Sequence, residues 1–172
     1  MEECGVVEIF GTAEDAKALE KLANAAEWAG LATDWHERMR SDEIIDAMLE
    51  ADDSGEWLRL VRDECGSFDD VLAACRNAGL SYIHTRGISG DEGYSTAYFW
   101  TPGWEKEFEA GLVNGVTIGV PFEDIQRASQ KGYDAVRELV AAYERNTLAD
   151  VEKTLKLAAE AVAELGGTRL NA

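Results

Sequence analysis

Cysteine and histidine are both scarce in this 172-residue chain. The cysteines are Cys4, Cys65 and Cys75, none in a Cys-x-x-Cys pair, and the histidines His36 and His84 lie far apart. This odd number of cysteines and the absence of clustered ligands predict neither a disulfide framework nor a structural zinc site. We expect Cys65 and Cys75 to be small buried hydrophobes, and we expect neither a metal ion nor a cofactor.

Long apolar runs and a basic leader are also missing. No run approaches the ~18 residues of a membrane span, and the N-terminus carries acidic residues without a preceding basic segment. This pattern predicts a cytoplasmic protein that does not bind membranes. Proline is rare and no segment rich in proline, glycine and serine divides the chain, so we expect a single domain over residues 1–172.

Basic residues are outnumbered by acidic ones, 16 to 34, which gives a net charge of −18. Such a chain repels nucleic acid and anionic membranes, because both require lysine and arginine for binding. It attracts basic proteins by electrostatic steering, although solubility alone would also account for the acidity. The acids are concentrated in residues 1–79, and the segment 41–56 holds seven acids and no base.

The first half of the chain is expected to be mainly helical after one short strand at residues 6–10. Apolar residues then recur at helical spacing in several segments that begin near capping residues. The expected helices begin at Thr12, at Ser41, at Ser54 or Gly55, and at Ser67. The third of these would carry Trp57, Leu58, Val61 and Cys65.

The pattern changes to strands in residues 80–120. The segments 81–86 and 95–100 are rich in aromatic and β-branched residues, and Asn114-Gly115 between β-branched runs is a strong hairpin signal. These features predict an antiparallel meander of three to four strands.

Helical spacing returns in residues 121–166, with Gly132 as a weak point and a break at Asn146. We expect two antiparallel helices there, joined near Thr147, which could also serve for dimerisation. The predicted fold is therefore α+β, with N-terminal helices, a central meander and a C-terminal antiparallel helical hairpin.

His84 is the strongest candidate for catalysis. A histidine with the nearby carboxylates Asp91 and Glu92 could act as general acid and base in a small hydrolase or transferase. No nucleophile elbow accompanies them. The evenly spaced glycines of the loop 87–93 could cradle a phosphate, but its two acids would repel one, and a hairpin loop explains the glycines better.

An acidic row is the first candidate for partner binding. Its members are Asp42, Asp46, Glu50 and Asp53, spaced so that they share one face of the expected helix. Like charges four residues apart destabilise a helix by a few tenths of a kcal/mol per pair, so fold stability does not require the row. The row could mimic a phosphate backbone for a basic cleft, although an ordinary solvated face is the alternative.

The aromatic stretch 94–104 is the second candidate. Strand alternation places Ile83, Ala97 and Phe99 on one face, toward the core. The other face would carry Tyr82, His84, Tyr98 and Trp100. Tyrosine and tryptophan are typical of interfaces as well as of cores, so this face could be either.

The sequence favours a non-enzymatic binding protein that docks on a basic, nucleic-acid-handling partner and inhibits it. Anti-CRISPR and other anti-defence inhibitors, DNA mimics and toxin-immunity proteins act in this way. The alternative is the hydrolase or transferase centred on His84. We expect a monomer or a homodimer and no direct binding of nucleic acid.

Overall fold

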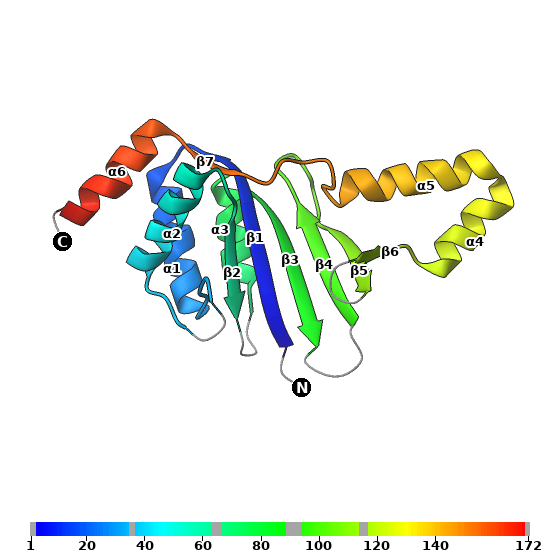
Figure 1. Cartoon of the computed structure of the whole chain (residues 1–172), viewed down its shortest axis with the longest axis horizontal. Helices are drawn as coiled ribbons and strands as arrows, with labels where there is room; N and C mark the ends of the chain where they lie inside the picture. Colours follow the sequence, from blue (N-terminus) through cyan, green and yellow to red (C-terminus); the bar gives the residue numbers. More distant parts are fainter. Residues whose placement is uncertain (1–2, 35–36, 63–66, 89–93, 114–116, 171–172) are drawn as a thin grey trace.

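The strand predicted at residues 6–10 is longer than expected and lies within the sheet (Figure 1). The computed structural model describes residues 3–34, 37–62, 67–88, 94–113 and 117–170. Its strands are β1 (Glu3–Ala13), β2 (Leu58–Arg62), β3 (Ser81–Ile88), β4 (Tyr94–Trp100), β5 (Phe108–Val113), β6 (Thr117–Gly119) and β7 (Leu155–Leu157). Its helices are α1 (Ala16–Trp28), α2 (Ser41–Ser54), α3 (Asp69–Asn77), α4 (Phe122–Lys131), α5 (Tyr133–Asn146) and α6 (Ala159–Leu170).

All the described strands belong to one sheet. Its order is β2-β1-β3-β4-β5-β6 with antiparallel neighbours, and β7 pairs with β1 in parallel. The meander predicted for residues 80–120 is confirmed as β3 to β6, although the Asn114-Gly115 signal itself lies outside the described residues. The mixture of helices with a mainly antiparallel sheet agrees with the α+β prediction, but β1 and β2 make the sheet larger than expected.

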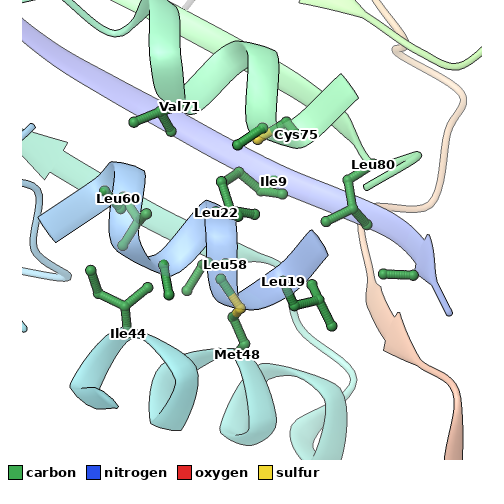
Figure 2. Close-up of a cluster of buried hydrophobic side chains, with 14 of the residues drawn as sticks. Ile9, Leu19, Leu22, Ile44, Met48, Leu58, Leu60, Val71, Cys75 and Leu80 are labelled. Atoms are coloured by element: carbon green, nitrogen blue, oxygen red, sulfur yellow. The ribbon is translucent and has the colours of Figure 1, made fainter. Parts of the chain in front are cut away.

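Helices α1, α2 and α3 provide the main core against this sheet. Figure 2 shows side chains of the three helices gathered around those of β1 and β2. The labelled residues are Leu19, Leu22, Ile44, Met48, Val71 and Cys75 from the helices, Ile9, Leu58 and Leu60 from the strands, and Leu80. Burial of each large apolar side chain stabilises the fold by about 1.5–3 kcal/mol.

Cys75 is fully buried in this core, as predicted, and burial raises the pKa of its thiol. A raised pKa keeps the sulfur protonated and unreactive. Cys65 and His36 lie outside the described residues.

A smaller apolar cluster occupies the second face of the sheet. It contains Phe10, Ile83, Ala97, Phe99, Ala110, Leu112 and Leu148. Ile83, Ala97 and Phe99 therefore share a buried face, as strand alternation predicted. Both faces of the central strands are covered, which decides the environment of the aromatic stretch.

The prediction of a helix beginning at Ser54 or Gly55 is wrong. Helix α2 ends there because Gly55 adopts a left-handed conformation, with φ of 71°, and the chain continues into β2. Leu58 and Leu60 point inward while Arg59 is exposed, and β2 pairs with β1 from Gly5 to Ile9. The spacing of Leu58 and Val61 fits a helix, and that of Leu58 and Leu60 fits a strand. In so short a run only the pairing with β1 selects the strand.

The predicted hairpin of residues 121–166 is only partly right. Its first helix is divided at Gly132, with φ of 109°, into α4 and α5, which pack against each other. The expected second helix is instead a turn, then β7, then α6. Leu155 and Leu157 are buried with Lys156 exposed, so parallel pairing with β1 imposes a two-residue period on this segment.

Asp52 is an unexpected link between α2 and β7. Its Oδ1 accepts a hydrogen bond of 3.0 Å from the backbone N–H of Leu157, 105 residues away in sequence. We expect Asp52→Ala to lower the free energy of unfolding by about 1–2 kcal/mol, because the half-buried N–H loses its acceptor. Urea denaturation would measure this, and exposed Asp53→Ala is the neighbouring control; equal effects of the two substitutions would contradict the role of Asp52.

Candidate functional site

An acidic cleft is the feature of the described surface best suited to binding. It has a volume of about 510 Å³ and lies between α2 and the segment that leads into β2. Its carboxylates belong to Glu43, Asp46, Glu50 and Glu56, and Arg59 contributes its one guanidinium. Four acids against one base give a negative cleft.

Trp57 lies in the same cleft and is 39% exposed. Gly55 makes this possible, because its left-handed conformation ends α2 and turns the next residues back along the helix. The indole therefore lies beside the acids of α2. An aromatic ring with neighbouring carboxylates is the combination that attracts lysine and arginine side chains.

The structure brings only part of the predicted acidic row into this cleft. Asp46 and Glu50 line it. Asp42 instead forms an ion pair of 3.0 Å with Arg40, and Asp53 is exposed but does not line the cleft. Glu43 replaces them, and its Oε2 also accepts a 2.8 Å hydrogen bond from the Arg40 N–H, which caps α2.

Sequence reasoning missed Glu43, Glu56, Trp57 and Arg59. The apolar spacing predicts a helix that carries Trp57, whereas in the structure residues 55–57 connect α2 to β2. Gly55 was the available signal, since a glycine directly after an acidic helix commonly ends it in a left-handed conformation and reverses the chain.

The predicted aromatic contact face is mostly core. Tyr82 is fully buried, Trp100 is 8% exposed, and Tyr98 is half-buried. Of the two interpretations left open for this face, the core therefore holds for Tyr82 and Trp100, which pack in one cluster with Val71, Leu72 and Cys75 of α3. Tyr82 stacks on Trp100 across the β3–β4 pair, with ring centroids 5.8 Å apart.

Arg76 and Glu107 provide hydrogen-bond partners for the polar groups at the edge of this aromatic cluster. The Tyr82 hydroxyl donates to Oε1 of Glu107 and accepts from Nε of Arg76 at 2.9 Å, and Arg76 pairs with Glu107 at 2.9 Å. Burial and the bond to Glu107 raise the pKa of Tyr82, so its hydroxyl remains protonated at neutral pH. The network closes the core at this edge.

His84 lies in the core, 4% exposed, between the rings of Phe68 and Tyr98. Its Nε2 is buried and has no hydrogen-bond partner among the described residues. Burial, with a smaller contribution from Arg86, lowers its pKa to about 4, so the imidazole is neutral at pH 7. Asp91 and Glu92, its predicted catalytic partners, lie outside the described residues.

Two other properties of the described chain bear on its chemistry. No three side chains among histidine, cysteine, aspartate and glutamate are grouped there in a way that could hold a metal ion. None of the helices described combines the length and apolar character needed to cross a bilayer.

Comparison with protein-family models, curated proteins and solved structures gave no match to this chain. The site is therefore interpreted from its own geometry, as a negatively charged cleft with an exposed indole.

Proposed function

We propose that the protein is a non-enzymatic binding protein that docks its acidic cleft on a basic protein and inhibits it. The observation that carries this proposal is the position of Trp57 among the carboxylates of Glu43, Asp46 and Glu50. A partner's arginine or lysine could place its charged head between these carboxylates and its stem against the indole ring.

The charge of the whole chain supports the same kind of partner. A net charge of −18 accelerates association with basic proteins and disfavours direct contact with nucleic acid. Asp46 and Glu50 lie one helical turn apart, about 6 Å along the axis, and could mimic part of a phosphate backbone. We therefore favour a nucleic-acid-handling partner, as for anti-CRISPR and other anti-defence inhibitors, DNA mimics or toxin-immunity proteins.

The test begins with capture of partners from a nuclease-treated lysate of the native host at low salt. A captured basic protein is then purified and titrated against the wild type and Asp46→Lys/Glu50→Lys by calorimetry. We expect the double substitution to weaken binding about 10- to 100-fold, because attraction in the cleft becomes repulsion. Added salt should weaken wild-type binding as well.

The matched control is Asp150→Lys/Glu152→Lys, which makes the same change in net charge at two exposed acids outside the cleft. It should bind within about 3-fold of the wild type, since charges far from the interface contribute mainly to encounter. Equal losses in both double variants would refute a specific cleft, and capture of no basic protein would refute the proposal.

A further inference from the structure

The helical arm formed by α4 and α5 projects from the sheet, away from α1 and α2 (Figure 1). Neither helix has a buried residue. Phe122 is 72% exposed and Tyr133 is 76% exposed, and Ile125 and Val140 are exposed as well. These four residues are called the arm stripe below.

The arm stripe is an unusual surface for helices of this length. Helices α4 and α5 have 10 and 14 residues, and isolated helices shorter than about 12–15 residues are marginal in water. Most helical stability in proteins comes from packing an apolar face, yet α4 and α5 pack mainly on each other. Both helices of the arm therefore expose apolar side chains whose burial would stabilise the arm.

The charge of the arm indicates what covers it. Residues 122–146 contain five acids and four bases, net −1, whereas the rest of the chain has 29 acids and 12 bases, net −17. A nearly neutral surface gives little attraction to a basic protein. It also gives little repulsion toward another copy of the same arm.

The order of charges along the arm favours an antiparallel pair. Helix α4 has Glu123 and Asp124 in its first turn and Lys131 in its last, and α5 has Asp134 in its first turn and Arg145 in its last. Two copies of such a helix, related by a two-fold axis perpendicular to it, place the acidic end of each beside the basic end of the other.

We propose that the arm binds the arm of a second copy of this chain, forming a two-fold symmetric dimer. The arm stripes of the two copies pack together, so that two helical hairpins make a four-helix bundle. Antiparallel pairing of α4 brings Glu123 of one copy near the partner's Lys131. This inference is independent of the acidic cleft, which lies on a different part of the molecule.

The length of the arm also reduces the cost of bringing two acidic proteins together. Helix α5 spans about 21 Å along its axis, at about 1.5 Å per residue. The Debye length is about 8 Å at physiological ionic strength, so the acidic bodies beyond the arms are largely screened from each other.

Sedimentation velocity of the full chain over a concentration series tests the dimer. At about 100 μM the wild type should give a mass twice that of the 18.8 kDa chain, because at this concentration a dimer with a micromolar dissociation constant is almost fully formed. Phe122→Ser/Tyr133→Ser should raise the dissociation constant at least about 30-fold, as expected when interface anchors are removed. Trp28→Ser/Val151→Ser removes two exposed apolar side chains outside the arm and should leave the constant unchanged.

A charge swap tests the antiparallel arrangement. Lys131→Glu should weaken the dimer, and the addition of Glu123→Lys in the same chain should restore it, because the acidic and basic ends again face each other. A monomeric wild type, or a dimer that the Phe122 and Tyr133 substitutions leave intact, would overturn the inference. Tighter capture of a basic protein by Lys131→Glu, without dimerisation, would assign the arm to that partner instead.

Discussion

Trp100→Ala is expected to lower the free energy of unfolding by about 3–5 kcal/mol, the range for large core aromatics. The indole is 8% exposed and stacks on Tyr82. Its Nε1–H donates a 3.1 Å hydrogen bond to the carbonyl of Trp104, and the Arg76 guanidinium lies 5.7 Å from its ring. The substitution opens a cavity and removes these contacts together.

Thermal and urea denaturation would measure this loss, with a fall in Tm of roughly 10 °C for a chain of this size. Trp28→Ala is the matched control, because Trp28 is 91% exposed and its loss should change stability by no more than about 0.5 kcal/mol. Similar losses of stability from the two substitutions would contradict the burial of Trp100 and would favour an exposed aromatic patch.

His84 is expected to make the fold sensitive to acid. Its pKa is lowered from 6.5 to about 4 by burial and by Arg86, and Asp69 opposes this shift. Below pH 6.5 the unfolded chain binds a proton at this histidine, while the folded chain does not until about pH 4. The unfolded state is therefore favoured progressively as the pH falls through this window, by about 3 kcal/mol at its lower end.

Urea denaturation of the wild type and His84→Phe at pH 7, 6, 5 and 4.5 would isolate this contribution, because the carboxylates titrate in both proteins. The stability of His84→Phe relative to the wild type should rise by about 2–3 kcal/mol between pH 7 and pH 4.5. His84→Gln should show the same change in slope from a lower starting stability, since it keeps a buried polar group but cannot titrate. Parallel curves for wild type and both variants would contradict a buried, neutral His84.

Local patterns were sufficient to predict much of the fold. Ser41 marks the beginning of α2, and alternation in residues 81–86 and 95–100 predicts two paired strands with Ile83 and Phe99 on one buried face. In these segments propensity, period and burial agree. The same reasoning failed for residues 54–62, because a short apolar run fits two periods and only pairing with β1 chooses between them.

The candidate site was half predictable. Asp46 and Glu50 belong to the acidic row that the sequence revealed, because their spacing is a property of one helix. Glu56 and Trp57 lie in the same cleft only because the chain reverses direction at Gly55. The spacing of apolar and acidic side chains along the sequence does not indicate that reversal. The tertiary structure also removed Tyr82 and Trp100 from the candidate surface.

The sequence by itself determined the charge of the protein, the acidic segment 41–56 and the order of helical and meander regions, since these depend on composition and local periodicity. The tertiary structure decided that both faces of the central strands are covered, that residues 155–157 pair with β1, and that Phe122 and Tyr133 of the arm stay exposed. The physical reason is that burial depends on contacts between segments far apart in sequence. The same alternating strand presents an exposed aromatic face or a core, according to whether a helix packs on it.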